Sequence, residues 1–350
     1  MMKKIKIYLI LLALIGSTFS YAGNPDRQGE AGANELLFNP WASSAALHGL
    51  NTSSILGVAA MRLNVAGISR GYDKAMVALS NTRLYEGSDL QFNSLGITVR
   101  MGKSGALGVS LAALDFGDIN ITTENAPEGT GGTYSPSFYH LGVGYSYTYA
   151  KKISVGALLR LIGESTNDIS AFGAAIDAGV QYVSGDRDNF KLGIALRNIG
   201  TPMKFGGSAL NFRGKNPAGN TSYELTFQHR AAGFELPSAL NMGISYDYYL
   251  SNNMYLRGMT SYTSNAFSLD QLGAGLEFNF RNILILRGSY MYELGQSSIE
   301  ETNIYSGVAG GFSVNVPLSK KNKNKLALDY AYRATYRFRG SHNFSVRIII

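Results

Sequence analysis

The chain has 350 residues, a formal net charge of +7, 41 glycines, 22 tyrosines and only 16% charged side chains. It contains no cysteine, which excludes disulfides, thiolate metal sites and a lipoprotein anchor. No run rich in lysine and arginine is interleaved with aromatic residues, so we expect no nucleic-acid partner.

The first 22 residues have the pattern of a cleaved export signal. Three lysines precede an apolar run over 7–15, and Ser20 and Ala22 supply small residues for cleavage after Ala22. The run is shorter than the ~20 residues that a membrane-spanning helix needs, and no later segment reaches that length. The sequence therefore predicts export without a transmembrane helix.

Residues 23–72 lack the two-residue alternation of a strand and are expected to be partly helical. A short helix should end at Asn39-Pro40, because proline disfavours helix in the residue before it. A second helix is expected over 52–64, with Thr52 as its N-cap. About fifty residues are few for a separate globular domain, so we predict a hatch or plug inside the structure that follows.

From residue 73 onward, apolar residues recur at every second position. In one example, Leu141, Val143 and Tyr145 alternate with Gly142 and Gly144. Because side chains alternate across a strand, each such segment has one apolar face and one small or polar face. Most segments are long enough for a tilted strand to cross a bilayer. The fourteen segments are 73–82, 92–101, 105–115, 137–149, 152–164, 171–183, 190–199, 238–249, 253–263, 270–281, 282–293, 305–316, 325–335 and 341–350.

The connections between these segments alternate in length. The two very long ones, 116–136 and 200–237, are both odd-numbered, and every even-numbered connection is short or modest. Short periplasmic turns and longer extracellular loops are typical of outer-membrane barrels, which have an even number of strands. We therefore predict an all-β protein of the cell outer membrane. It comprises a signal peptide (1–22), an N-terminal helical hatch (23–72) and a transmembrane antiparallel β-barrel of about 14 strands (73–350), surrounded by outer-membrane lipid.

The polar face of the segments is expected to line the lumen. It bears acids and arginines in equal number, which favours internal ion pairs over a charge-selective pore. These residues are Asp177, Asp247, Glu277, Asp329, Arg197, Arg287, Arg333 and Arg347. Glycines on the same face either leave room for a segment close to the wall or relieve strand curvature. Examples are Gly142, Gly144, Gly273 and Gly275.

Residues 67–71 spell G-x-S-x-G, the consensus around a hydrolase nucleophile. That consensus needs its serine between a strand and a following helix, whereas Ser69 follows a predicted helix and precedes a predicted strand. The four histidines are scattered, and no metal-binding motif is present. We therefore expect no catalytic residue, no metal ion and no cofactor, and we do not expect an enzyme.

The long connections exceed what barrel closure needs, and loops of this length are commonly functional. The connection over 200–237 contains four phenylalanines that are candidate anchors for a protein partner. These are Phe205, Phe212, Phe227 and Phe234. A lid that packs on itself over the barrel mouth is the alternative.

The N-terminal segment resembles the signature of the FadL-like outer-membrane proteins. Those proteins have a glycine-bearing helix and then Asn-Pro-Ala-Gly-Leu before the first strand. Here Asn64, Val65, Ala66, Gly67 and Ile68 occupy those positions, with Val65 in place of proline.

Within that superfamily the chain looks most like the PorV/PorQ group of Bacteroidetes. The supporting stretches are NPWASS, which begins with Asn39, Pro40 and Trp41, together with LDFGDI over 114–119 and GIALRNIGTPMKF over 193–205. The resemblance implies a component of type IX protein secretion that binds a translocon barrel or exported cargo. The alternative is a FadL-like transporter for hydrophobic small molecules.

Overall fold

The computed structural model describes residues 27–71, 74–215, 224–296, 303–318 and 324–350. The predicted signal peptide and its cleavage site after Ala22 lie outside these residues. Within the described ranges, no helix has the length and apolarity required to cross a membrane.

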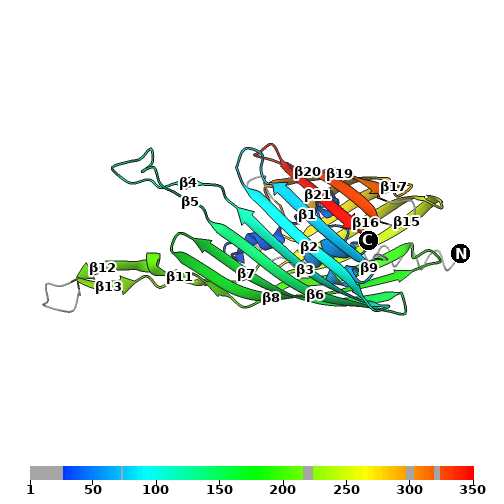
Figure 1. Cartoon of the computed structure of the whole chain (residues 1–350), viewed down its shortest axis with the longest axis horizontal. Coiled ribbons are helices and arrows are strands. Elements are labelled where there is room, and N and C mark those ends of the chain that lie inside the picture. Colours follow the sequence, from blue (N-terminus) through cyan, green and yellow to red (C-terminus); the bar gives the residue numbers. More distant parts are fainter. Residues whose placement is uncertain (1–26, 72–73, 216–223, 297–302, 319–323) are drawn as a thin grey trace.

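Fourteen long strands form a closed antiparallel barrel (Figure 1). Closure follows from the first strand, which pairs with both the second strand and the last one. The strands are β1 (Ala75–Arg83), β2 (Gln91–Met101), β3 (Gly105–Asp115), β6 (Ser137–Tyr149), β7 (Ile153–Thr166), β8 (Ile169–Ser184), β9 (Phe190–Gly200), β15 (Ala239–Ser251), β16 (Met254–Asn265), β17 (Gln271–Phe280), β18 (Leu284–Glu293), β19 (Tyr305–Pro317), β20 (Lys325–Thr335) and β21 (Ser341–Ile349). The prediction of a 14-stranded transmembrane barrel is confirmed.

The two ends of the barrel differ in their connections. Short turns join the strands at the end where the chain finishes, which we call the turn end (Figure 1). One of them, between β17 and β18, has φ of 53° at Arg281 and 55° at Asn282, the pair of positive values that a tight hairpin turn requires. The predicted strands 270–281 and 282–293 therefore end slightly earlier and begin slightly later than expected.

The opposite end, which we call the loop end, contains additional small strands. The connection after β3 holds β4 (Ile119–Asn120) and β5 (Thr133–Tyr134). The connection after β9 holds β10 (Met203–Lys204), β11 (Gly206–Gly207), β12 (Asn211–Lys215), β13 (Glu224–Gln228) and β14 (Gly233–Phe234). The sequence predicts loops for both connections, and these small strands are a difference from that prediction. Figure 1 shows β12 and β13 extending well beyond the barrel.

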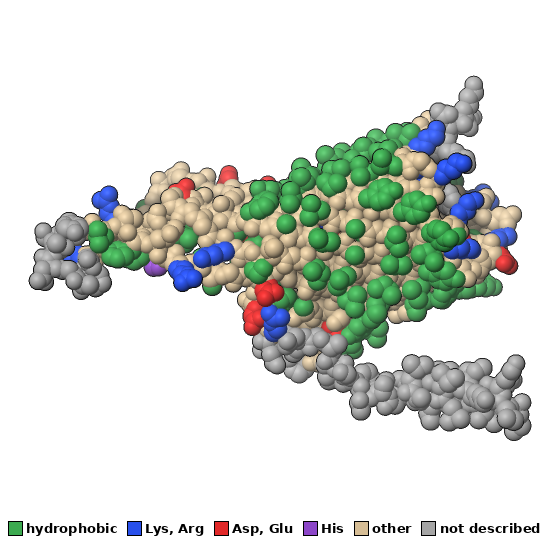
Figure 2. Space-filling view, turned by 90° about the horizontal axis from the view of Figure 1, so that it is seen from below, with side chains coloured by type: hydrophobic (Ala, Val, Ile, Leu, Met, Phe, Trp, Pro, Cys, Tyr) green, Lys and Arg blue, Asp and Glu red, His purple; other side chains and the backbone are tan. Residues whose placement is uncertain are grey.

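Exposed apolar side chains occur along the barrel strands, and Figure 2 shows many of them on one face of the barrel. Exposed tyrosines occur towards the turn end of β6 and β15, at Tyr149 and Tyr248, and towards the loop end of β18, at Tyr290 and Tyr292. Aromatic girdles at the two membrane interfaces, with an apolar band between them, are typical of transmembrane barrels. The outer surface is therefore suited to lipid.

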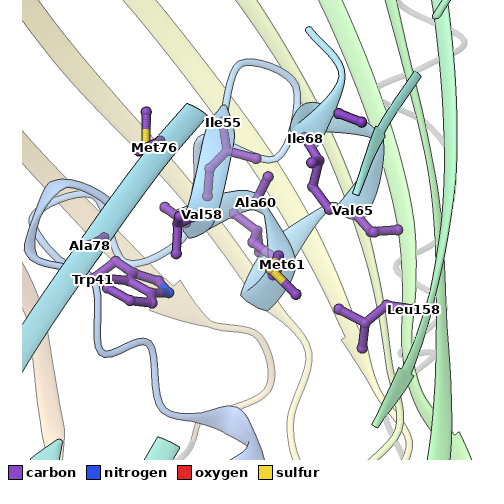
Figure 3. Close-up of a cluster of buried hydrophobic side chains, with 13 residues drawn as sticks. Trp41, Ile55, Val58, Ala60, Met61, Val65, Ile68, Met76, Ala78 and Leu158 are labelled. Atoms are coloured by element: carbon purple, nitrogen blue, oxygen red, sulfur yellow. The ribbon is translucent and has the colours of Figure 1, made fainter. Parts of the chain in front are cut away.

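We call the described N-terminal residues, 27–71, the hatch. They lie inside the barrel except at their start, where residues 28–30 are exposed and Ala31 pairs with Glu235 of the loop end. Their helical elements are short: η2 (Asn34–Leu37), α2 (Ala42–Ala45), η3 (Gly57–Ala59), α3 (Ala60–Leu63) and η4 (Val65–Ile68). Trp41, Val58 and Met61 of the hatch pack with Ala78 of β1 and Leu158 of β7 in one buried apolar cluster (Figure 3). Burial of this cluster holds the hatch against one side of the wall.

The prediction of a continuous helix over 52–64 is wrong. Gly57 has a φ of 63°, which interrupts a right-handed helix. The main-chain oxygens of Thr52 and Ile55 accept hydrogen bonds at 3.1 Å from the side chain of Gln181 in β8 instead of bonding within a helix. Thr52 is not an N-cap, because its hydroxyl donates to the oxygen of Gly49.

Wall glycines let the hatch approach closely. A methyl group added at Gly179 would lie 2.1 Å from the side-chain oxygen of Asn64, and one at Gly193 would lie 2.5 Å from the oxygen of Thr52. Of the four glycines named from the sequence, three face the hatch, since Gly144 meets Val65, Gly273 meets Leu50, and Gly275 meets Leu47. Gly142 instead lies against Ser110 and Leu158 of the wall.

Candidate functional site

The Asn39-Pro40-Trp41 segment attaches the hatch to the seam where the barrel closes. The side chain of Asn39 accepts from the Trp41 N–H at 3.2 Å and donates to Ser44 at 2.8 Å, which fixes the bend around Pro40. The oxygen of Pro40 then accepts from Ser80 of β1 at 2.5 Å. Trp41 is 3% exposed within the apolar cluster, so this segment has a structural role.

Asn64 attaches the hatch to the opposite side of the wall. Its amide nitrogen donates to the oxygens of Thr52, Val180 and Ile194 at 3.0, 3.1 and 3.4 Å. Its side-chain oxygen accepts from the Ala66 N–H at 3.2 Å and so caps η4. One asparagine therefore connects two parts of the hatch with β8 and β9.

The three residues after Asn64 pack tightly against the wall and against another part of the hatch. Val65 and Ala66 are buried, and both lie close to Gly156 of β7. A methyl group on Gly67 would lie 2.1 Å from the oxygen of Ile55, so no side chain fits at that position. Asn64, Val65, Ala66 and Gly67 thus form one packed unit against the wall.

Ser69 is held by hydroxyl groups. Its Oγ lies 2.6 Å from the Oγ of Ser146 and 2.8 Å from the Oγ1 of Thr148, both in β6. It follows η4 and precedes β1, the reverse of the order that a nucleophile elbow needs. Ser69 therefore fastens the end of the hatch to the wall.

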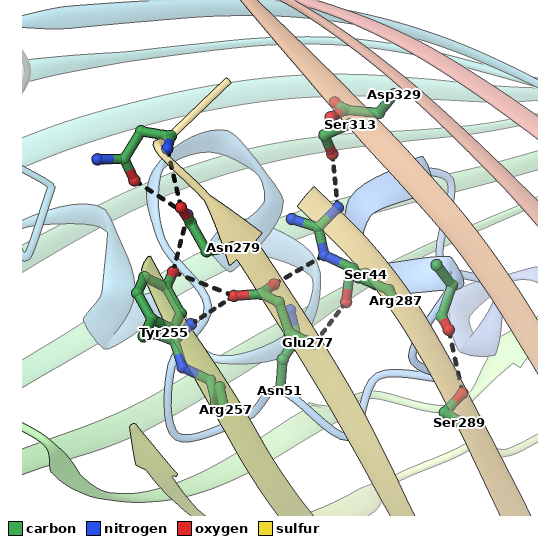
Figure 4. Close-up of polar contacts among 12 residues, drawn as sticks. Ser44, Asn51, Tyr255, Arg257, Glu277, Asn279, Arg287, Ser289, Ser313 and Asp329 are labelled. Atoms are coloured by element: carbon green, nitrogen blue, oxygen red, sulfur yellow. Dashed lines mark hydrogen bonds and ion pairs between the residues drawn. The ribbon is translucent and has the colours of Figure 1, made fainter. Parts of the chain in front are cut away.

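A row of alternating charges crosses four neighbouring strands of the inner wall. Arg257 of β16 bonds Asp247 of β15 at 2.5 Å and Glu277 of β17 at 3.0 Å. Arg287 of β18 bonds the other oxygen of Glu277 at 2.8 Å and Ser313 of β19 (Figure 4). The two members of each charged pair in the row lie directly opposite each other on adjacent strands. The predicted internal ion pairs are present here.

Further ion pairs line the wall on both sides of this row. Lys191 also pairs with Asp247, Arg160 pairs with Asp177 at 2.5 Å, and Arg347 pairs with Asp329 at 2.6 Å. Arg160, Lys191 and Arg257 are not among the lumen charges predicted from the sequence. Arg160 and Arg257 share the lumen-facing parity of their strands, so the same alternation contained the signal for them.

A second buried cluster surrounds Arg62 of the hatch. Its guanidinium donates to the oxygens of Phe38 and Glu35 at 2.7 and 2.5 Å. The Glu35 carboxyl lies 3.0 Å from Nε2 of His140 in β6. Burial, with the nearby carboxyl of Glu164, raises the pKa of Glu35 to about 7. No motif in the sequence indicated this cluster, because its members come from four separate segments.

A cavity of about 490 Å³ lies at the loop end between the hatch and the wall. Hatch residues Leu37, Phe38, His48 and Leu63 form one side of it. The other side comes from β9 and from β15 through β20, with the connections that join them. Wall residues include Arg197, Asn241, Leu269, Met291, Tyr305 and Arg333. The cavity is partly open, and polar side chains outnumber apolar ones in its lining. A concave pocket between two packed parts of a protein is a candidate small-molecule site.

Two arginines border this cavity, and they differ in the contacts that they make. Arg197 donates to Asn241 at 2.8 Å and to the oxygen of Arg62 at 3.2 Å, so it joins the hatch to β15. Arg333 lies with its guanidinium carbon 4.2 Å from the centre of the Tyr305 ring. Both are among the lumen residues predicted from the sequence, but no sequence pattern predicts the cavity. A cavity depends on how the hatch fills the barrel, which no local pattern encodes.

The four candidate phenylalanines of the long connection form two pairs. Phe205 and Phe234 have ring centres 5.6 Å apart and pack on a buried cluster with Leu36 of the hatch. Phe212 and Phe227 stack 5.5 Å apart in β12 and β13. Only the second pair lies on the extended part of the loop end, where Phe212 is 45% exposed.

The sequence matches no family model and no curated protein. The fold matches solved structures of 14-stranded barrels. The CymD monoaromatic hydrocarbon channel has a TM-score of 0.55 and 16% identity, over 89% of this chain and 97% of that one. The Pseudomonas putida toluene transporter TodX has a TM-score of 0.52 and 14% identity, over 85% and 94%. A Pseudomonas aeruginosa FadL homologue has a TM-score of 0.53 and 10% identity, over 88% and 97%. The protein therefore has the fold of the FadL-type barrels.

Proposed function

We propose that the protein is an outer-membrane channel for small hydrophobic molecules, with the hatch as its gate. The cavity of about 490 Å³ between hatch and wall is the observation that carries this proposal. Its size lies within the range of roughly 300–1,000 Å³ that small-molecule sites occupy. The hydrocarbon channels that share the fold support the same assignment.

A second candidate is a PorV/PorQ-like component of type IX secretion that binds a translocon barrel or exported cargo. The extended pair β12 and β13 favours it, because a stacked aromatic pair on an exposed arm suits a protein contact. A partner contact at this arm does not require the lumen cavity. The channel is therefore the better-supported function of the two.

Uptake of radiolabelled toluene separates the two functions. We expect a deletion strain to take up toluene more slowly than the parent and to export its surface proteins normally. A strain that loses surface proteins but takes up toluene at the parental rate would overturn the channel and favour secretion.

The absence of native cysteine allows a direct test of the gate. The hydroxyls of Ser53 in the hatch and Ser245 in β15 lie 2.9 Å apart and are both buried. The double variant S53C/S245C places two sulfurs where a disulfide can form. We expect the oxidised form to block toluene uptake and reduction to restore it. The single variant S53C serves as the matched control under both conditions.

A further inference from the structure

The turn end of the barrel carries a patch of positive charge. Lys103 lies in the turn after β2, Lys151 in the turn after β6 and Arg187 in the turn after β8, and all three residues are exposed. We call these three residues the basic patch. Figure 2 shows lysine and arginine side chains gathered at this end of the barrel, beside exposed apolar side chains of the strands.

Main-chain hydrogen bonds place the three turns side by side. The N–H of Thr148, at the end of β6, donates at 2.9 Å to the oxygen of Ser104 in the turn after β2. The N–H of Val183, at the end of β8, donates at 2.9 Å to the oxygen of Lys152 in the turn after β6. The basic patch therefore occupies one continuous arc of the barrel rim.

The acids of these turns do not neutralise the basic patch. Asp188 lies 2.8 Å from the Nζ of Lys152 and 3.9 Å from Arg70, so it is engaged by cations outside the patch. Among the described residues, no member of the patch forms an ion pair, and Arg187 donates to the neutral side chain of Asn252 at 3.3 Å. Over 102–104, 150–152 and 185–189 the chain has four cations and two acids, a net charge of +2.

The loop end of the same part of the barrel has the opposite charge. The connections over 84–90 and 116–136 follow β1 and β3, and together they contain five acids and no lysine or arginine. Because like charges repel, negatively charged groups are disfavoured there and favoured at the basic patch. The charge distribution therefore favours an anionic partner at one end of the barrel only.

The basic patch begins where the lipid-facing side chains end. Met101 and Tyr149 are 53% and 67% exposed and have the outward parity of β2 and β6. Lys103 and Lys151 follow them by two residues. The turn after β6 is a tight hairpin with φ of 48° at Ala150 and 58° at Lys151, which keeps Lys151 close to Tyr149. Cations in such positions reach lipid head groups while their apolar neighbours contact acyl chains.

We infer that the basic patch binds the phosphate head groups of anionic phospholipids in the leaflet around the turn end. The short connections of the sequence predict that this end is periplasmic. Lysines and arginines close to a membrane surface attract anionic lipids. A soluble polyanion matches the charge of the patch but makes no use of the apolar residues Met101 and Tyr149 beside it. The inference goes beyond the proposed function and does not depend on whether the lumen conducts small molecules.

The test measures the lipid selectivity of the protein surface. The full chain is reconstituted in bilayers of dioleoyl-phosphatidylcholine with a trace of phosphatidylglycerol or phosphatidylcholine, spin-labelled at the same acyl carbon. Electron paramagnetic resonance gives the association constant of each probe with the barrel. One cation near the surface favours an anionic lipid roughly fivefold. Averaged over the whole perimeter, we expect a preference for phosphatidylglycerol of at least about twofold. It should disappear in about 1 M NaCl, where the Debye length is about 3 Å.

Two triple variants with the same change in net charge separate the basic patch from the charge of the whole protein. The first neutralises the patch and is K103Q/K151Q/R187Q, and it should abolish the preference for phosphatidylglycerol. The second neutralises two exposed lysines and one exposed arginine of the loop end and is K204Q/K215Q/R230Q. It should keep the parental preference. Circular dichroism and Trp41 emission check that the barrel and the hatch are folded in both variants.

Equal association of the two probes with the parent would overturn the inference, and so would an equal loss of preference in the two triple variants. Poly-L-glutamate serves as a soluble anionic probe of the protein in detergent. If the parent binds it through the patch and bilayers show no lipid preference, the patch serves an acidic macromolecule and the lipid assignment is wrong. None of these results depends on toluene uptake, so the proposed channel is tested separately.

Discussion

The side-chain amide of Asn64 donates a hydrogen bond at 3.1 Å to the main-chain oxygen of Val180, and so ties the hatch to β8. On the other side of the lumen, Pro40 ties it to β1. Trp41 lies next to that second attachment and is the single tryptophan of the chain. Its emission therefore reports on the hatch separately from the barrel.

Replacing Asn64 by alanine should loosen the hatch without opening the barrel. The change removes the cap of η4 and the amide that donates to the buried oxygens of Val180 and Ile194, a loss of buried hydrogen bonds that typically costs about 1–3 kcal/mol. We expect a lower urea midpoint by Trp41 emission and an unchanged barrel midpoint by circular dichroism. Asn211→Ala, at an exposed site of β12, is the control. Equal Trp41 midpoints for the two variants would show that Asn64 is not an anchor.

A methyl group at Gly179 should produce the same loosening from the wall side. The added carbon would lie 2.1 Å from the side-chain oxygen of Asn64, so the asparagine must move. Overpacking of this kind costs about 1–3 kcal/mol. The matched control is Gly288→Ala in β18, where nothing lies within 4 Å of the added carbon. The prediction fails if Gly179→Ala and its control have the same Trp41 urea midpoint.

The stability of the hatch should fall as the pH rises from 5 to 8. The pKa of Glu35 in the fold is about 7, above its ordinary value of 4.5, because the carboxyl is buried near Glu164. Its protonated form is thus favoured by folding, and this stabilisation is complete below pH 4.5 and is lost as the pH rises through 7. Urea midpoints from Trp41 should therefore be higher at pH 5.

Glu35→Gln is expected to flatten that pH dependence. The neutral amide cannot ionise, so the difference between pH 5 and pH 8 should shrink. Glu30→Gln changes an exposed carboxylate that pairs with Arg27 and should keep the slope of the parent. If the urea midpoint of the Glu35→Gln protein changes with pH as much as that of the parent, another group causes the pH dependence.

Neutralising Glu277 should destabilise the barrel itself. Its two oxygens hold Arg257 and Arg287, and the removal of one member of a buried ion pair typically costs 3–5 kcal/mol. We expect Glu277→Gln to lower the unfolding midpoint of the barrel in lipid vesicles, followed by circular dichroism. Glu30→Gln removes only an exposed ion pair, so it should change the free energy of unfolding by less than about 1 kcal/mol. Equal shifts would mean that the charge row does not support the wall.

Much of the fold was predictable because a membrane barrel obeys a simple local rule. Every residue of a strand faces either lipid or lumen, so the alternation through Leu141, Val143 and Tyr145 sufficed to locate β6. The hatch follows no such rule. The carbonyls of Thr52 and Ile55 bond Gln181 of a distant strand, and this tertiary contact replaced the helix predicted there.

The sequence by itself determined the strands, their number, the lumen-facing set of charges and the uneven connections, since each depends on neighbours in the chain. Only the tertiary structure decided which charges pair and where space remains. Arg287 and Arg333 have the same inward parity, yet Arg287 meets Glu277 across the strand pair, whereas Arg333 meets Tyr305 and a cavity. That difference arises from register and from the path of the hatch, and both are set by contacts between residues far apart in the chain.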